Sequence, residues 1–303
     1  MKVKRTLYSI TAVFVVMYAA HAQEGALEFP TGARNASLVN ANIAEPADIS
    51  VMYENPAPLV FLEKNTVLLN HSQGMTLHGM QETLALPLLL TSTTAIALSL
   101  DAYHDGYVGN ALPAYERSFE YGYDLALAHE IAPTMSLGAG VVFRRGAVGG
   151  NSQSWGAYYS VGADYAPTPD IGYGIVYSTT ARALPVSPFD SGSVTVRDLG
   201  RKKLEVGGTM SYPSSASLRS PIVRISFANE KIFGTKGLYY KGGVEIRPME
   251  YVALRFGYLA GPRVYSARYG LGITANPLAF QYAICPLHGA DIILQQFSVS
   301  LEL

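Results

Sequence analysis

The chain alternates apolar residues with polar or small ones in consecutive segments of about ten residues, and turn residues separate these segments. Proline recurs in every second turn, where its fixed φ and its missing backbone N–H are tolerated. The recurring prolines are Pro87, Pro133, Pro167, Pro213, Pro248 and Pro277. This pattern predicts a succession of β-hairpins and constrains the fold more than any other feature of the sequence.

Counting the alternating segments predicts fourteen antiparallel strands. They span residues 61–72, 76–86, 93–103, 116–129, 134–145, 154–166, 170–180, 200–212, 221–230, 236–246, 250–260, 264–275, 278–285 and 291–302. A soluble β-sandwich also alternates, but an open sheet this wide would expose hydrophobic edges. Aromatic residues at the strand ends also favour a membrane barrel. The predicted fold is an all-β, transmembrane up-and-down β-barrel over residues 61–303.

The N-terminal residues predict export. Residues 1–22 resemble a signal peptide, because basic residues precede a short apolar run and Ala20-His21-Ala22 provides a small-x-small cleavage site. Only 15% of the residues are charged and 21 are tyrosines, which fits a barrel with tyrosines at both membrane interfaces. We therefore expect a location in the cell outer membrane of Gram-negative type. The net charge of −1 does not suggest a nucleic-acid partner.

Loop lengths predict the orientation of the barrel. The proline turns are short and are expected on the periplasmic side. The connections 104–115, 146–153 and 181–199 are longer and are expected outside, where functional loops are common. They carry the candidate ligand-binding residues Leu112, Tyr115, Leu184, Val186 and Phe189.

The segment before the barrel, residues 23–60, does not alternate and is rich in small residues. A barrel of this size needs its interior filled, so this segment is predicted to form a hatch, or plug, in the lumen. A disordered periplasmic tail is the alternative. Ile49, Val51, Met52 and Tyr53 provide apolar surface to bury, which favours ordered packing.

Motifs in this segment and near the C-terminal end resemble the FadL-like outer-membrane proteins, in particular the PorV/PorQ group. The N-terminal motifs are Gly32-Ala33-Arg34, Ala36, Asp48, Asn55-Pro56-Ala57 and Leu59. The C-terminal motifs are Leu254-Arg255-Phe256-Gly257-Tyr258, Tyr269-Gly270-Leu271-Gly272-Ile273 and Gln281-Tyr282-Ala283. The chain departs from the family at Val39-Asn40, where Met-Gly is expected, and at Pro58, where glycine is usual. Asn40 and Pro58 are not expected to copy the backbone freedom of those glycines.

The resemblance implies a fourteen-stranded barrel with an N-terminal hatch, and it leaves two functions open. The PorV/PorQ likeness implies a partner-binding barrel in protein secretion or surface attachment, similar to type IX secretion. The FadL likeness implies a transporter for long-chain fatty acids or other hydrophobic compounds. The short external loops favour the first function. The expected partners are outer-membrane lipids, with secretion-machinery or cargo proteins in the first case and a hydrophobic ligand in the second.

Charged residues on the small-residue face of the strands are expected to point into the lumen, because a charge facing lipid is costly. The predicted hatch and lumen residues are Arg34, Asp48, Asn55, Pro56, Asp124, Arg144, Asp164, Glu205, Arg224, Glu245 and Arg255, with Asp101, Lys241 and Arg268 as further inward charges. Buried charges need partners, so these residues are expected to pair across strands and with the hatch. Arg34 is expected to fix the hatch by binding an inward carboxylate such as Asp124.

The sequence contains no recognisable catalytic constellation, cofactor motif or metal cage. His71 and His78 lie on the first predicted hairpin and are expected to be interfacial side chains rather than catalysts. Cys285 is the only cysteine, which excludes an internal disulfide. We therefore expect a protein that is not an enzyme and that needs no cofactor.

Overall fold

A computed structural model describes residues 32–45, 49–74, 79–105, 119–148, 152–184, 197–198, 202–212, 223–262, 264–287 and 292–303. The expectations for the signal peptide, His78, Asp48 and most of the external loops lie outside these residues. Four of the five candidate ligand-binding residues also lie outside them: Leu112, Tyr115, Val186 and Phe189.

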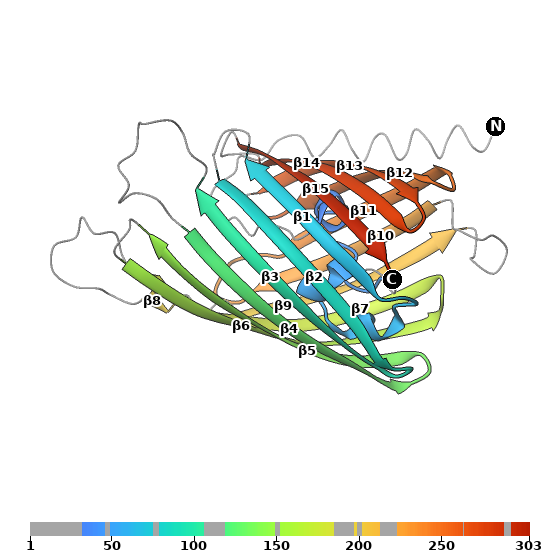
Figure 1. Ribbon diagram of the computed structural model, residues 1–303, viewed down its shortest axis with the longest axis horizontal. Coiled ribbons are helices and arrows are strands. Elements are labelled where there is room, and N and C mark those ends of the chain that lie inside the picture. The colour runs from blue at the N-terminus through green and yellow to red at the C-terminus, as the bar shows by residue number, and fades with distance from the viewer. Residues whose placement is uncertain are drawn as a thin grey trace.

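Fourteen antiparallel strands close into a barrel in which each strand pairs with its neighbours in the chain (Figure 1). The strands are β1 (Thr66–Gly74), β2 (Gly79–Thr91), β3 (Thr94–Asp105), β4 (Phe119–Ala132), β5 (Met135–Val148), β6 (Ser152–Thr168), β7 (Ile171–Leu184), β9 (Lys202–Tyr212), β10 (Val223–Ile232), β11 (Tyr239–Met249), β12 (Val252–Ala260), β13 (Tyr265–Ala275), β14 (Leu278–Leu287) and β15 (Ile292–Glu302). The last strand pairs with the first, from Thr66–Glu302 to Gly74–Leu294, and so closes the ring. The predicted fold class and strand count are confirmed.

The wall of the barrel is uneven in height. Strands β4 to β7 have 14 to 17 residues, whereas β10 to β15 have only 9 to 11. The pairing of β7 with β9 ends at Thr179, and β7 continues to Leu184. The two-residue strand β8 (Arg197–Asp198) pairs with this extension. The taller part of the wall therefore includes the end of β7 that pairs with β8.

Several predicted turns and loops need correction. Pro87 lies within β2 opposite Ala97, not in a turn. The pairing of β2 with β1 ends at Ala85, so beyond that point β2 is paired on one side only, where proline is tolerated. The predicted loop 146–153 shrinks to three residues, because β5 and β6 continue through most of it. The predicted loop 181–199 loses its first four residues to β7 and contains β8.

Two other prolines that the pattern assigns to turns lie at strand ends. Pro167 is near the end of β6 and Pro248 is near the end of β11. Each lies at a shift in the pairing register with the next strand, between Tyr165 and Thr168 in β6 and between Ile246 and Met249 in β11. A bulge of this kind accommodates a residue that cannot donate to the ladder.

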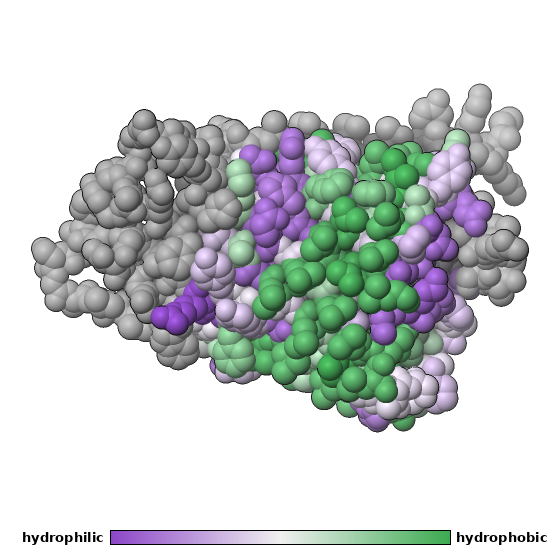
Figure 2. All heavy atoms as spheres, viewed as in Figure 1, coloured by the Kyte–Doolittle hydropathy of each residue, from purple (hydrophilic) through white to green (hydrophobic). Residues whose placement is uncertain are grey.

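The two faces of each strand differ as the alternation predicts. On β4, Tyr123 and Leu125 are about half exposed on the outer face, whereas Asp124 and Ala126 between and beside them are buried in the lumen. Figure 2 shows the outer face over β1–β5, where hydrophobic residues gather in a broad band with hydrophilic residues on both sides. A continuous apolar band of this kind is typical of a barrel that contacts hydrocarbon.

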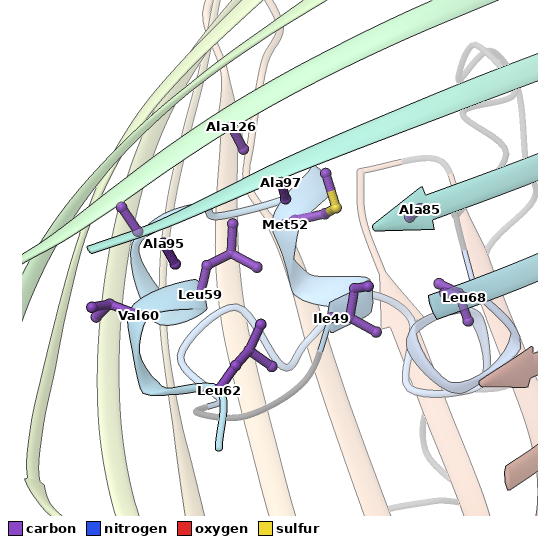
Figure 3. Packing of buried hydrophobic residues seen from close by; sticks show 11 residues of the cluster. Ile49, Met52, Leu59, Val60, Leu62, Leu68, Ala85, Ala95, Ala97 and Ala126 are labelled. Atoms are coloured by element: carbon purple, nitrogen blue, oxygen red, sulfur yellow. The ribbon is translucent and has the colours of Figure 1, made fainter. Parts of the chain in front are cut away.

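The described residues before β1 lie inside the barrel, where they contact inward-facing residues of the wall. This hatch comprises the described residues 32–45 and 49–62, with the helix α2 (Ala33–Ser37) and the 3₁₀ turns η1 (Ile49–Tyr53) and η2 (Ala57–Phe61). Figure 3 shows Met52 and Leu59 beside the small side chains of Ala95 and Ala97 on β3. Alanine on the wall leaves room for the larger hatch residues. None of the described helices is long and apolar enough to cross a membrane.

Inward-facing glycines let the hatch approach the barrel backbone on two sides. A Cβ atom at Gly257 on β12 would collide with the carbonyl oxygen of Ser37, and one at Gly138 on β5 would collide with the backbone of Ala57. These two strands lie on nearly opposite sides of the ring. The hatch therefore spans the lumen and fits both walls closely.

The backbone at Val39 and Asn40 is left-handed, with φ angles of 53° and 57°. The expectation that Asn40 cannot copy a glycine is wrong, because asparagine tolerates this conformation. Its side-chain Nδ2 also donates to Glu54 Oε1 at 2.6 Å, which ties two parts of the hatch together. Pro58 lies in the first turn of η2, a position that suits the fixed φ of proline.

Replacing Gly257 by alanine should shift the hatch away from β12, because the added methyl group overlaps the hatch backbone. We expect a loss of about 1–3 kcal/mol in the free energy of unfolding, as in other overpacked interiors. The measurement is the temperature at which the purified barrel loses its compact, fast-migrating form on a gel. Gly242→Ala on the adjacent β11 is the matched control, since a Cβ there meets nothing within 4 Å. Equal transition temperatures for the two variants would contradict the close fit.

Candidate functional site: the hatch and the charged lumen

Arg34 connects the hatch to the barrel wall. Its Nη2 atom lies 2.6 Å from Glu45 Oε1 within the hatch, and its Nε atom lies 2.9 Å from Glu245 Oε2 on β11. The carboxylate that it binds on the wall is Glu245, not the expected Asp124. Asp124 is on β4, which belongs to a different part of the ring.

The strand register places the other members of this arginine network, which comprises Arg34, Glu45, Arg224, Glu245 and Arg255. On neighbouring strands Arg224 is opposite Glu245, and Glu245 is opposite Arg255. The Nε atom of Arg255 lies 2.6 Å from Glu245 Oε2, and Arg224 forms an ion pair with Glu45. Glu45 and Glu245 are almost completely buried, so the surrounding guanidinium groups stabilise their charges.

A second group of charges, the lysine network, comprises Glu54 of the hatch with Lys203, Glu205, Glu230 and Lys241 of the wall. Glu205 and Glu230 lie opposite each other on β9 and β10, and Lys241 Nζ lies 2.8 Å from the first and 2.7 Å from the second. A shared cation is needed there, because two facing carboxylates repel. Lys203 Nζ lies 3.1 Å from Glu54 Oε2 and so provides a second ionic link to the hatch.

Glu54 remains ionised inside the lumen. Burial alone raises the pKa of its carboxyl group, but the ammonium groups of Lys203 and Lys241 outweigh burial and hold this pKa below its ordinary value. Asn40 adds a charge-assisted hydrogen bond to the same carboxylate. The hatch is thus bound to the β9–β12 wall by two of its own carboxylates and one guanidinium.

The opposite part of the lumen has fewer ionic links to the hatch. Asp101 on β3 accepts a hydrogen bond from Thr83 Oγ1 at 2.5 Å, and Asp124 accepts one from Ser99 Oγ at 2.7 Å. The Nη2 atom of Arg144 lies 3.9 Å from Asp101 Oδ2. Arg144 and Asp101 pair along the wall, as expected for inward charges, whereas among the described residues Asp124 forms no ion pair and is bonded to the Ser99 hydroxyl. The hatch packs against this side mainly through the apolar contacts around Leu59.

Asn55 and Pro56 lie against inward-facing glycines of the wall, Asn55 at Gly162 on β6 and Pro56 at Gly138 on β5. Asn55 Nδ2 donates to the carbonyl oxygen of Ile43 at 3.0 Å, and its Oδ1 accepts from the backbone N–H of Ala57 at 3.1 Å. Ser136 Oγ on β5 donates to the carbonyl oxygen of Ala57 at 2.8 Å. Asp164 on β6 is only 2% exposed, and its carboxyl oxygens have no hydrogen-bond partner among the described residues.

Four residues of the ionic networks are absent from the sequence-based selection: Glu45, Glu54, Lys203 and Glu230. The period-two alternation could have identified two of them. Lys203 is two residues from Glu205, and Glu230 is six residues from Arg224, and both Glu205 and Arg224 are predicted to face the lumen. Both pairs share a face of one strand. No periodic signal marks Glu45 or Glu54, which lie in irregular hatch backbone.

The candidate ligand-binding residues of the external loops are not brought together in the part of the chain that the structure describes. Leu184 is the last residue of β7 and pairs through its backbone with Arg197 of β8. Among the described residues no cluster of histidine, cysteine, aspartate and glutamate has the arrangement of a metal site.

Replacing Arg34 by alanine should loosen the hatch, because Glu45 and Glu245 both lose a buried counter-charge. Breaking such a pair typically costs about 3–5 kcal/mol. We expect higher single-channel conductance in planar bilayers and greater sensitivity of the cells to large antibiotics.

Lys64→Ala is the control for this variant. The ion pair of Lys64 with Glu302 is about half exposed on both sides, and such a pair contributes at most about 1 kcal/mol. If Arg34→Ala had the conductance and antibiotic sensitivity of the wild type and of Lys64→Ala, Arg34 would not fasten the hatch.

Comparisons with known proteins identify the fold. No family model matches the chain, and no curated protein is similar to it in sequence. The structure is similar to the Ralstonia pickettii toluene transporter TbuX, with 12% identity, a TM-score of 0.60, and coverage of 86% of this chain and 95% of that one. It is similar to a Pseudomonas aeruginosa FadL homologue, with 12% identity, a TM-score of 0.58, and coverage of 93% and 99%. It is also similar to the Pseudomonas putida toluene transporter TodX, with 10% identity, a TM-score of 0.57, and coverage of 93% and 98%. The chain therefore has a FadL-like barrel fold.

Proposed function

We propose that this protein is an outer-membrane channel for hydrophobic compounds. The observation that carries the proposal is the combination of a closed fourteen-stranded barrel with a hatch bound inside its lumen. The structure matches toluene transporters and a FadL homologue over most of their length. Monoaromatic hydrocarbons and long-chain fatty acids are the substrate classes to test first.

The second candidate is the partner-binding barrel of PorV/PorQ type that the sequence motifs imply. The matched structures named above are described as transport proteins or as a FadL homologue, so they favour the hydrophobic-compound channel. A hatch bound by two ionic networks suits either function, because both require that the barrel stays closed to small solutes. The secretion function therefore takes second place.

The outer-membrane location is supported by the apolar band on the outer face (Figure 2). Leu125→Arg would put a charge in this band, since Leu125 is 48% exposed on the outer face of β4. We expect the variant to lose about 2–4 kcal/mol of stability in lipid and to assemble poorly in the membrane. Ser92→Arg, in the exposed turn between β2 and β3, should assemble like the wild type. Cell fractionation and heat-modifiable gel migration measure the membrane assembly of the two variants. Normal assembly of Leu125→Arg would argue against a lipid-facing band.

Uptake by a Gram-negative host that lacks its own hydrophobic-compound channel tests the transport function. Cells with the wild-type protein should take up labelled toluene or oleate faster than cells with an empty vector. They should take up a small sugar no faster, because the hatch fills the lumen. A protein that leaves hydrocarbon uptake unchanged, but that recovers secretion-machinery or cargo proteins in a pull-down from outer membranes, would favour the partner-binding function.

A further inference from the structure

A groove of about 530 Å³ crosses the outer wall of the barrel over β15, β1, β2, β3 and β4. Two adjacent rows of outward side chains line it, and the pairing registers align the members of each row. The first row is Phe297, His71, Glu82, Ala102 and Tyr121, and the second is Val299, Leu69, Leu84, Leu100 and Tyr123. We call this feature the wall groove. It lies outside the lumen and shares no outward side chain with the hatch site.

The shape of the wall groove suits a chain-like molecule. It crosses four strand spacings, which corresponds to about 19 Å at about 4.8 Å per spacing. Because the strands of such barrels are tilted by about 35–45°, the groove runs obliquely to the membrane normal. Ala102 lies between Glu82 and Tyr121 in the first row, and its small side chain leaves space that a larger residue would fill. Aromatic residues stand at both ends.

One hydrogen-bonded polar pair interrupts the apolar lining. His71 Nδ1 lies 2.6 Å from Glu82 Oε1, and the two side chains are 40% and 53% exposed on the outer face. In the second row, the residues on the same two strands are the apolar Leu69 and Leu84. The pair therefore lies at the margin of the apolar band, where lipid chains join their polar head groups. With Nδ1 engaged by Glu82, the ring nitrogen Nε2 and the second oxygen of Glu82 are the atoms that can bond a polar group in the groove.

We propose that the wall groove binds one hydroxylated acyl chain of an outer-leaflet lipid, with its hydroxyl group at His71 and Glu82. The groove is continuous with the hydrocarbon-facing band, so its occupant comes from the membrane. A hydroxyl group both donates and accepts, so it can bond the imidazole and the carboxylate together. A plain hydrocarbon chain would leave this polar pair facing apolar atoms. The inference rests on the outer-membrane location proposed above and not on transport.

Filling the groove tests the proposal. The wild-type barrel, extracted from outer membranes in a mild detergent, should retain a lipid with hydroxylated chains that native mass spectrometry detects. Ala102→Phe should reduce its occupancy by about tenfold or more, because an aromatic ring occupies the space of the chain. Ala139→Phe is the matched control, since Ala139 is exposed on the outer face of β5 and does not line the groove. Heat-modifiable migration verifies that all the proteins are folded.

Removing the polar pair tests the chemistry of recognition. The double variant with His71→Leu and Glu82→Leu keeps an apolar groove and should bind hydroxymyristoyl and myristoyl phosphatidylethanolamine equally from mixed micelles. The wild type should prefer the hydroxylated lipid by about fivefold or more, as expected for the loss of a hydrogen bond worth about 1 kcal/mol.

Four results would overturn the proposal. They are detergent alone in the wild-type groove, equal lipid occupancy in Ala102→Phe and the wild type, an unchanged preference in the double variant, and a protein segment bound instead of lipid. Hydrocarbon uptake, measured in the same strains, is independent of these results. Failure of the channel function would appear as no uptake by the wild type, whereas failure of the wall groove would appear only in the lipid measurements.

Discussion

The structure depends on one constraint, which is that every backbone polar group facing hydrocarbon must find its partner within the protein. The register between β1 and β15 meets this constraint by closing the ring. Closure also fixes which face of each strand meets lipid, since a shift by one residue would exchange all the faces. The large apolar residues then point outward, and the glycines, alanines and charges are left to line the lumen. The inward-facing glycines and alanines leave room for the hatch, and the inward-facing charges form the ionic networks.

The strands and their number could be predicted because period-two alternation is a local property of the sequence. Pro87 shows the limit of such reasoning, because proline is acceptable wherever a strand lacks a neighbour on one side. Whether a neighbour is present depends on where β1 begins, at Thr66. The left-handed backbone at Val39 likewise has no signal in the residue itself, because β-branched residues rarely adopt it, whereas Asn40 tolerates this conformation.

The lumen was predictable as a set of charges but not as a set of pairs. Alternation places Arg34's partner Glu245 in the lumen, yet it gives no information on which carboxylate the hatch reaches. That choice depends on where α2 lies, and α2 lies where Gly257 leaves room for Ser37. The hatch is therefore positioned by small residues and then held by charged ones. In the proposed channel function, a solute has to displace or bypass the hatch that spans the lumen.

The unequal strand lengths have a geometric consequence for the mouth of the barrel. A barrel whose rim is higher on one side opens toward its lower side. Because β7 continues past the end of its pairing with β9, the described strands form a rim that is higher on the β4–β7 side than on the β10–β15 side. At this higher rim the end of β7 pairs with β6 on one side and with β8 on the other, so its backbone is not left as an open edge.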